Sequence, residues 1–402
     1  MAESEIPRLN VAVIGAGFMG KAHSLAYAAM PMYFWPPPAA PYRKVIAELT
    51  DELAQTAAAR FGYESWTTDW RRIVDDPEID VVDIASPNDT HCEIAVAAAE
   101  AGKHIICEKP LARTADEARQ MVEAANRAGV TNMVAFNYRR VPAVALAKKY
   151  VDEGAIGRVL SFQGTYFQDW SADPNTPMVW RFDKSIAGSG ALGDIGAHSL
   201  DLARHLVGEI ASVMGILQTH IPERPLQARP AGEGPTGTVD VDDEVHTMFR
   251  FANGAVGSLV ATRNAQGRPN FDTFEIHGET GSLYFDYQRC NELQVCFTDD
   301  ERERRGFRTI ITGPDHPYGD ALWPIAGVCI GYAETKIIEC YELCRAITEG
   351  IAAEPDFGDG YQVARICEAI QLSASNGAWI DVPPLDRQGS AAAPDLHGVA
   401  TT

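Results

Sequence analysis

The sequence predicts an α/β fold in which a doubly wound parallel sheet precedes an α+β domain with a mostly antiparallel sheet. Strands alternate with helices as far as about residue 140, and strand-like runs separated by glycine turns dominate the rest. The length of 402 residues is typical of two domains, and 46% apolar residues can supply their cores. We therefore expect domains at 1–140 and 141–385, followed by a disordered tail at 386–402.

In the first half, short β-branched runs alternate with Ala-rich helical stretches. Such a series requires βαβ crossovers, which make the strands parallel. Segment 30–41 carries prolines that should end the first helix, and it is expected to form a subunit contact or a flap over a site. The expected strands are 9–15, 45–47, 81–85, 104–107 and 132–136, and the expected helices are 18–30, 51–61, 90–101 and 114–128.

The second half is dominated by strand-like runs. Glycine-bearing turns at 252–254 and 278–281 favour antiparallel hairpins between them. The expected strands are 158–170, 212–220, 245–251, 255–262, 273–277, 283–287 and 293–297, and the expected helices are 142–153, 193–207, 332–349 and 360–375.

Acidic residues outnumber basic ones, since 34 Lys and Arg against 55 Asp and Glu give a formal charge of −21. Affinity for nucleic acid or anionic membranes is built from clustered Lys and Arg, so neither partner is expected. The 8 cysteines include no CxxC pair and are interpreted as reduced thiols. Because the acidic start also lacks the basic region of a signal peptide, the protein is expected in the cytoplasm.

A glycine-rich turn separates the first strand from the first helix. Gly15, Gly17 and Gly20 form the pattern GxGxxG. The first glycine permits a tight turn, the second lets the backbone approach a pyrophosphate, and the third lets the helix pack on the strand. Because the helix N-terminus then faces the anion, the pattern predicts a dinucleotide site.

An acidic residue at the end of the second strand would bind the ribose hydroxyls of the dinucleotide. Glu48 follows strand 45–47 directly but lies 48 − 20 = 28 residues past Gly20, whereas the usual distance is about 20. The insertion at 30–41 accounts for the excess, and Asp51 is an alternative source of the carboxylate. Since a carboxylate here would repel a 2′-phosphate, NAD is predicted rather than NADP.

Segment 193–205 is expected to be a helix with chemistry on one face. At about 100° per residue, a single stripe would carry Asp194, His198, Asp201 and His205. Two carboxylates and two imidazoles on one stripe indicate a reactive site.

Four motifs carry a family resemblance: the glycine turn in 11–20, Ala-Ser-Pro-Asn-Asp-Thr-His at 85–91, Glu-Lys-Pro at 108–110, and Gly-Asp-Ile-Gly-Ala-His at 193–198. In this order and spacing they resemble the Gfo/Idh/MocA sugar and polyol dehydrogenases, over residues 9 to 382. The resemblance implies an NAD-binding Rossmann domain followed by an open-faced antiparallel α/β domain. It also implies oxidation of a carbinol.

The resemblance also assigns residues. Lys109, Asp194 and His198 match the Lys, Asp and His that inositol dehydrogenases use on the reacting carbinol, and Glu48 falls on the ribose-binding acid. The nicotinamide end would be lined by Ala85, Pro87, Asn88 and Glu108. The complete predicted cofactor site consists of Gly15, Gly17, Phe18, Met19, Gly20, Glu48, Ala85, Ser86, Pro87, Asn88, His91, Glu108, Lys109 and Asn137.

The expected chemistry is removal of hydride from a carbinol, which requires a base on the hydroxyl and a donor for the developing negative charge. His198 could take the proton, Asp194 could orient the imidazole, and Lys109 could donate to the oxygen. Burial could instead make Lys109 the base. Structural roles are expected for Asp201 and His205. Asp and His four residues apart could ligate zinc, but this oxidation needs no metal, so none is predicted.

A loop-rich stretch at 169–189 combines aromatic and charged side chains, which suit a neutral sugar with apolar ring faces and a hydroxylated rim. Within the family, residues 21–32, the insertion and 170–175 look most like members that oxidise the C3 hydroxyl of the anhydrosugar levoglucosan. The predicted substrate-binding residues are Lys109, Tyr138, Arg139, Trp170, Trp180, Arg181, Asp194 and His198.

Other functions remain open at this point. Some family members oxidise inositols, and others oxidise glucosides at C3. Some cleave a glycosidic bond through a transient oxidation that leaves no net redox change. A non-catalytic dinucleotide-binding sensor would keep the fold without turnover. In each case the open face of the second sheet must be covered, so a homo-oligomer, either a dimer or a tetramer, is expected.

Overall fold

The computed structural model describes residues 6–227 and 234–385, so the predicted tail lies outside the described residues. Its first sheet has six parallel strands in the order β3-β2-β1-β4-β5-β6, which confirms the doubly wound prediction. The strands are β1 (Arg8–Ile14), β2 (Ala40–Ala47), β3 (Ser65–Thr67), β4 (Val81–Ile84), β5 (His104–Cys107) and β6 (Asn132–Val134). The helices are α1 (Phe18–Tyr33), α2 (Asp51–Phe61), α3 (Arg71–Asp75), α4 (His91–Glu100) and α5 (Ala115–Ala128), with short turns η1 (Asn88–Thr90) and η2 (Asn137–Arg140).

The second sheet has nine strands in the order β16-β15-β14-β13-β7-β12-β11-β8-β17. All neighbours pair antiparallel except β7 and β12, so the sheet is mostly antiparallel, as predicted. The sequence did not predict the separate ribbon of β9 (Glu223–Pro225) and β10 (Thr236–Thr238). The nine strands are β7 (Val159–Phe167), β8 (Ile210–Gln218), β11 (Glu244–Phe251), β12 (Val256–Thr262), β13 (Phe271–Gly278), β14 (Gly281–Asp286), β15 (Glu292–Phe297), β16 (Arg308–Ile311) and β17 (Ile380–Asp381).

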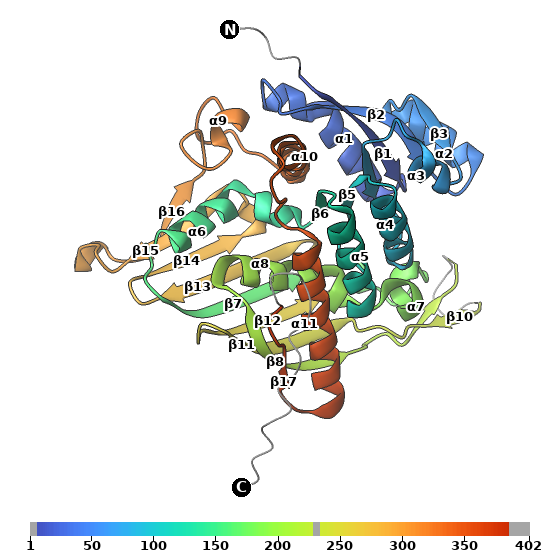
Figure 1. The fold of residues 1–402 in the computed structure, drawn as a ribbon. Coiled ribbons are helices and arrows are strands. Elements are labelled where there is room, and N and C mark those ends of the chain that lie inside the picture. Colours follow the sequence, from blue (N-terminus) through green and yellow to red (C-terminus); the bar gives the residue numbers. More distant parts are fainter. Residues whose placement is uncertain (1–5, 228–233, 386–402) are drawn as a thin grey trace.

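Helices cover one face of the second sheet and leave the other face open (Figure 1). Helices α6, α8 and α11 pack on the covered face, and α11 also reaches α5 of the first half. The helices after residue 140 are α6 (Pro142–Asp152), α7 (Lys184–Ala187), α8 (Ala197–Val207), α9 (Gly319–Leu322), α10 (Tyr332–Glu349) and α11 (Phe357–Asn376). The remaining turns are η3 (Trp180–Phe182), the π-helical η4 (Leu192–Gly196), η5 (Tyr287–Arg289) and η6 (Arg302–Arg304).

The two halves interlock through α10, which packs on α1. Ile337, Ile338 and Leu343 of α10 share a core cluster with Val13 and Met30. A segment far beyond residue 140 therefore completes the core of the first sheet, and the domain boundary itself stays a prediction.

Helix α1 ends later than the sequence predicts. It continues through Pro31, because a proline in the last turn removes a single backbone donor, and the Phe34 N–H still reaches the Met30 carbonyl at 2.9 Å. The Phe34 ring then stacks on Tyr341 of α10, with centroids 4.0 Å apart. The insertion therefore packs beside α10, and none of residues 30–41 lines the cleft described below.

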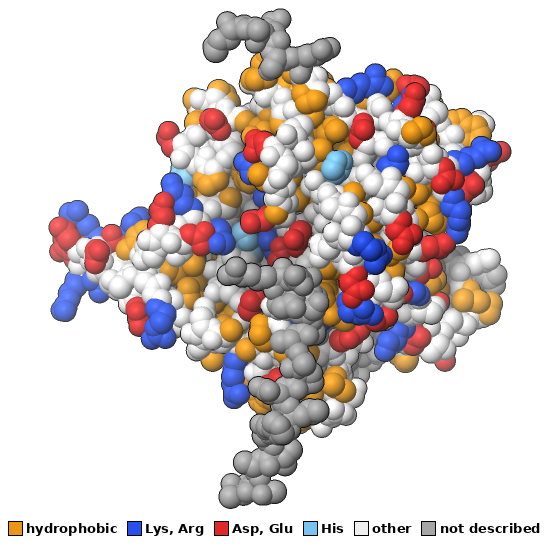
Figure 2. Space-filling view, viewed as in Figure 1, with side chains coloured by type: hydrophobic (Ala, Val, Ile, Leu, Met, Phe, Trp, Pro, Cys, Tyr) orange, Lys and Arg blue, Asp and Glu red, His pale blue; other side chains and the backbone are white. Residues whose placement is uncertain are grey.

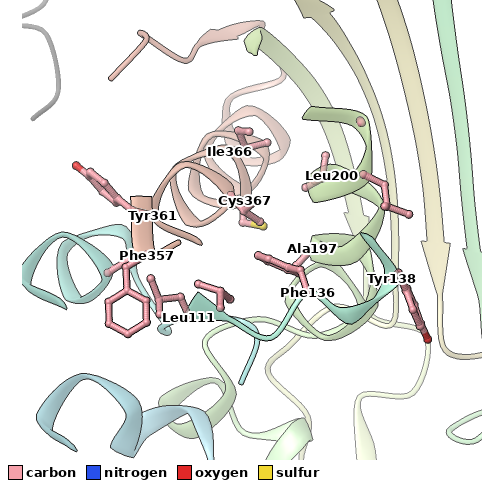
Figure 3. Close-up of a cluster of buried hydrophobic side chains, with 14 of the residues drawn as sticks. Leu111, Phe136, Tyr138, Ala197, Leu200, Phe357, Tyr361, Ile366 and Cys367 are labelled. Carbon is pink, nitrogen blue, oxygen red and sulfur yellow. The ribbon is translucent and has the colours of Figure 1, made fainter. Parts of the chain in front are cut away.

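A buried cluster braces α8, the helix that follows the π-helical turn. Figure 3 shows Ala197 and Leu200 of α8 in one buried cluster with Phe136, just after β6, and with Ile366 and Cys367 of α11. Ala197, Leu200 and Ile366 have no exposed surface. This packing holds the start of α8 rigidly against the end of β6, which is where the two halves meet.

Lys, Arg, Asp and Glu side chains are interspersed on the face shown in Figure 2 rather than gathered by sign. Within the described part of the chain, no helix has both the length and the apolar character needed to cross a membrane.

Candidate active site

A cleft of about 1000 Å³ lies between the carboxyl ends of the parallel strands and the end of β7. Residues from both halves of the chain line it. A position at the carboxyl ends of the strands is typical of ligand sites in doubly wound sheets. Among the predicted residues it brings together Gly15, Gly17, Phe18, Met19, Glu48, Ala85, Ser86, Pro87, Asn88, Glu108, Lys109, Tyr138, Trp170, Trp180, Arg181, Asp194 and His198.

The glycine turn at one end of the cleft has the geometry of a dinucleotide loop. Gly15 has a φ of +101°, and a Cβ there would lie 2.7 Å from the Ala85 carbonyl oxygen. A Cβ on Gly20 would lie 1.9 Å from the Gly15 carbonyl oxygen, so Gly20 packs α1 against the turn and does not line the cleft. A Cβ on Gly17 would meet nothing within 4 Å, which leaves room for a phosphate at the N-terminus of α1.

Glu48 stands beside this turn, directly after β2. Its Oε1 accepts from the Ala16 N–H at 2.7 Å, and its Oε2 accepts from the Leu49 N–H at 3.0 Å. The alternative acid, Asp51, begins α2 as an exposed residue outside the cleft. The open backbone at Gly17 and the anchored carboxylate of Glu48 together fit the pyrophosphate and ribose of a dinucleotide.

Lys109 and Asp194 meet in the middle of the cleft. The Lys109 Nζ donates to the Asp194 carbonyl oxygen at 2.6 Å and lies 3.5 Å from its Oδ1. Asp194 also faces two arginines, with Arg263 Nη1 at 3.4 Å from Oδ2 and Arg181 Nε at 3.8 Å from Oδ1. Burial alone would raise the pKa of Asp194, but these three cations outweigh it and hold the pKa at about 2. The carboxylate therefore stays ionised across the physiological range.

His198 lines the same cleft and packs between aromatic rings. Its ring centroid lies 4.4 Å from that of Tyr138 and 5.8 Å from that of Phe136. Burial, followed by the charge of Lys109, holds the pKa of His198 well below its ordinary value. The imidazole is therefore neutral at pH 7 and able to accept a proton.

The prediction that Asp194 orients the His198 imidazole is wrong in this structure. The Nδ1 of His198 is buried without a hydrogen-bond partner among the described residues, and both Asp194 oxygens face cations instead. Tyr138 and Phe136 hold the ring by packing.

The predicted stripe along one helix is also wrong, because the helix does not begin as an α-helix. Residues 192–196 form the π-helical turn η4, and of the four predicted residues only Asp194 and His198 line the cleft. Asp242 anchors this turn, accepting from the Gly190 N–H at 2.7 Å and the Leu192 N–H at 2.8 Å. Asp201, for which a structural role was expected, accepts from Arg139 instead of reaching the cleft.

Besides Gly20, three predicted site residues lie outside the cleft. Arg139, expected at the substrate, is buried in an ion pair with Asp201, with Nε donating to Oδ2 at 2.8 Å. Asn137 donates to Thr335 Oγ1 of α10 at 2.8 Å. His91 has no exposed surface and lies 2.9 Å from the Ser86 carbonyl oxygen, so it supports the cofactor turn from below. These side chains do not line the cleft, because they are buried polar groups whose hydrogen-bond partners lie elsewhere in the protein.

Several cleft residues were not predicted from the sequence, and apart from Asp89 and Thr90 they come from segments without a motif. Tyr166 on β7 is linked to Tyr138, with the two hydroxyl oxygens 2.7 Å apart, and it donates to Asn270 at 2.9 Å. Gln168 also donates to Asn270, at 2.8 Å. The other lining residues that were not predicted include Thr68, Trp70, Asp89, Thr90, Ser189, Arg263 and Tyr332.

Glu108 is held from below by a buried network of charges. Its Oε1 accepts from Lys336 Nζ of α10 at 2.8 Å and lies 2.9 Å from Nε2 of His23, while its Oε2 accepts from the Lys109 N–H at 3.1 Å. Burial would raise the pKa of Glu108, but Lys336 and His23 bring it well below its ordinary value. Burial lowers the pKa of His23, but Asp83 and Glu108 outweigh it and raise the pKa to about 9. This network anchors the backbone that carries Lys109.

Comparison with known proteins agrees with this geometry. Residues 9–136 match the model of an oxidoreductase family with an NAD-binding Rossmann fold, and residues 144–284 match that of the GFO/IDH/MocA C-terminal domain. A levoglucosan dehydrogenase of Pseudarthrobacter phenanthrenivorans is 65% identical over 385 residues, covering 94% of this chain and 99% of that protein. The scyllo-inositol 2-dehydrogenase (NAD(+)) of Bacillus subtilis is 31% identical over 243 residues, covering 60% of this chain and 65% of that protein.

A solved structure of levoglucosan dehydrogenase in complex with NADH and levoglucosan superposes with a TM-score of 0.91 at 65% identity. The superposition covers 94% of this chain and 100% of the levoglucosan dehydrogenase chain. Fold, glycine turn and the two family models thus agree on an NAD-binding oxidoreductase. The chain belongs to the GFO/IDH/MocA family of NAD-binding oxidoreductases.

Proposed function

We propose that this enzyme oxidises a secondary hydroxyl of a neutral sugar, namely the C3 hydroxyl of levoglucosan, to a ketone. The observation that carries the proposal is the meeting of Lys109, Asp194 and His198 in the cleft that also holds the glycine turn. The names of the relative and the solved complex support levoglucosan as the substrate.

The contacts of Lys109 and His198 suggest separate roles for them. Lys109 donates to the carbonyl oxygen of Asp194 and lies beside its carboxylate, so it is placed for donation to the carbinol oxygen. His198 is neutral at pH 7, because burial and the Lys109 charge lower its pKa, so it suits removal of the hydroxyl proton. NAD⁺ bound at the glycine turn would accept the hydride from the carbinol carbon.

The wall opposite the glycine turn supports a neutral ligand. Trp170 and Trp180 provide apolar faces, while Gln168 and Asn270 provide amide groups. Aromatic faces with a few fixed polar groups are typical of sugar sites. Arg181 adds a cation, but it already faces Asp194 at 3.8 Å.

The test is an NADH absorbance screen of the purified enzyme over levoglucosan, glucose, glucosides and inositols, with NAD⁺ and NADP⁺. We expect NADH to accumulate with levoglucosan and NAD⁺. Turnover of inositol alone would reassign the substrate. Sugar cleavage without net NADH would indicate a redox-neutral lyase, and binding without turnover would indicate a sensor.

We also propose that the open face of the second sheet is a contact between copies of this chain. Ile216, Met248 and Val256 on this face are 65%, 53% and 53% exposed. Their strands β8, β11 and β12 are neighbours, so these side chains form one apolar patch. Light scattering should report a multiple of the 43.7 kDa chain mass, and a mass of 43.7 kDa would contradict the proposal.

A further inference from the structure

Arg263 is a buried arginine in the wall of the cleft. It follows β12 directly, has no exposed surface, and places Nη1 at 3.4 Å from Asp194 Oδ2. Its guanidinium lies 5.2 Å from the Trp170 ring centroid. It is thus the cation on the Oδ2 side of Asp194, whereas Lys109 and Arg181 lie nearest to Oδ1.

The same guanidinium is tied to the two segments that frame Asp194. Nη1 lies 3.4 Å from the Arg181 carbonyl oxygen, and Nη2 lies 3.4 Å from the carbonyl oxygen of Asp242. Asp242 anchors the π-helical turn η4 that carries Asp194. Arg263 therefore joins the carboxylate, the turn below it and the cleft wall beside it.

A second buried arginine in this region provides a comparison. Arg224 also has no exposed surface and lies 4.2 Å from the Phe182 ring centroid, against 5.4 Å for Arg263. However, within residues 6–227 and 234–385, Arg224 donates to the carbonyl oxygens of Ser171 and Asp173 and does not line the cleft. The two arginines share burial and an aromatic neighbour, but Arg263 alone of the two reaches Asp194.

Burying a guanidinium is costly unless its charge is used, because an apolar side chain would fill the space without losing hydration. The Nε of Arg263, like that of Arg224, has no partner among the described residues, and the carbonyl contacts of its Nη atoms are long, at 3.4 Å. Its close charged partner is Asp194.

We propose that Arg263 is a positioning residue that fixes the Asp194 carboxylate and thereby aims the Lys109 ammonium at the carbinol oxygen. This inference rests on the proposed roles of Lys109 and Asp194. Misplacing a donor by about 1 Å can cost about 10² in rate, so loss of this ion pair should reach the chemical step.

The electrostatics of Asp194 support this role. The charged and titratable groups that face it are Lys109, Arg181, His198, Arg263 and Tyr166. Burial raises the pKa of Asp194, and Arg263 is the second of the cations that lower it, after Lys109. Removing Arg263 should therefore raise this pKa, so the active carboxylate would be lost at a higher pH as the solution is acidified.

The test compares Arg263→Met and Arg263→Lys with the matched control Arg224→Met. For each variant, kcat, KM and the pH profile of kcat/KM are measured with levoglucosan, together with NADH binding by fluorescence and thermal unfolding. We expect Arg263→Met to lower kcat by about 10² and to move the acid limb to higher pH, with NADH binding unchanged. Arg263→Lys should keep the acid limb but lower kcat by about tenfold, because an ammonium cannot reproduce the forked contact.

Arg224→Met should lose thermal stability and retain kcat and the pH profile. If Arg263→Met behaves in the same way, Arg263 is only structural and the inference fails. If Arg263→Met does not fold, a wild-type kcat in Arg263→Lys overturns it. If the wild type oxidises no sugar, the proposed function fails separately. A crystal structure of either Arg263 variant that keeps Lys109 Nζ at 3.5 Å from Asp194 Oδ1 would then contradict the positioning role.

Discussion

The two ends of the cleft are built in different ways. At the dinucleotide end, turns at 15–19 and 85–88 line the cleft, and each turn lies within one βα unit. At the substrate end, side chains from distant segments meet around one carboxylate, since Lys109 and Asp194 are 85 residues apart and Arg263 is 69 residues beyond Asp194. A site made of local backbone can be recognised from a motif, whereas a site made of distant side chains depends on how the two sheets dock.

The largest expected effect lies at the substrate end. Lys109→Ala should lower kcat by about 10² or more, because the developing charge on the carbinol oxygen loses its donor. NADH binding, measured by fluorescence, should be unchanged. Lys103→Ala is the matched control, because Lys103 is also buried but donates to the carbonyl oxygens of Asp76 and Ile79 away from the cleft. A near-wild-type kcat in Lys109→Ala would remove the assigned role.

His198→Ala should lower kcat by about 10² as well, through loss of the base. Because the pKa of His198 is lowered, the neutral base persists as the pH falls through 6.5, and wild-type kcat/KM should decline only at lower pH. The control is His205→Ala, which changes another histidine of α8 that lines a different cavity. If wild-type kcat/KM instead rises through alkaline pH, Lys109 would be the better candidate for the base.

The dinucleotide end should respond in binding rather than in turnover. Glu48→Ala should weaken NAD⁺ binding by about tenfold, since a charged hydrogen bond to the ribose is worth about 1.5 kcal/mol, and kcat should change little. It should also narrow the preference for NAD⁺ over NADP⁺. Asp51→Ala is the control, and an equal loss of affinity there would point to Asp51 as the ribose acid.

The smallest effect on catalysis is expected from a residue that the sequence placed at the substrate and the structure does not. Arg139→Met leaves Asp201 buried without its partner, so the free energy of unfolding should fall by about 3 kcal/mol. Because Arg139 does not line the cleft, kcat should stay at the wild-type value. Urea titration and steady-state kinetics test both statements, and a large loss of kcat in the folded variant would return Arg139 to the substrate site.

The misassignments share a cause. Periodicity assumes one helix geometry, so it could not reveal the π-helical turn at Leu192–Gly196 that carries Asp194 and precedes α8. Arg139 and Asn137 were assigned to the site because they are neighbours of Tyr138 in the sequence. In the structure, Arg139 donates to Asp201 and Asn137 donates to Thr335, so neither lines the cleft. Arg263 follows β12 and Asp242 precedes β11. Neither segment carries a motif, so no sequence pattern indicated that these residues belong to the site.

By itself, the sequence determined the order of most strands and helices and the dinucleotide turn, and it singled out Lys109, Asp194 and His198 as candidates, because these follow from local periodicity, short-range motifs and the family resemblance that the motifs carry. The tertiary structure decided what those three residues touch. It places Asp194 among three cations and leaves Nδ1 of His198 without a partner in the described chain, which reverses the expected pairing. The physical reason is that a buried charge is satisfied by its nearest partner in space, and that partner is set by how β12, η3 and η4 pack together.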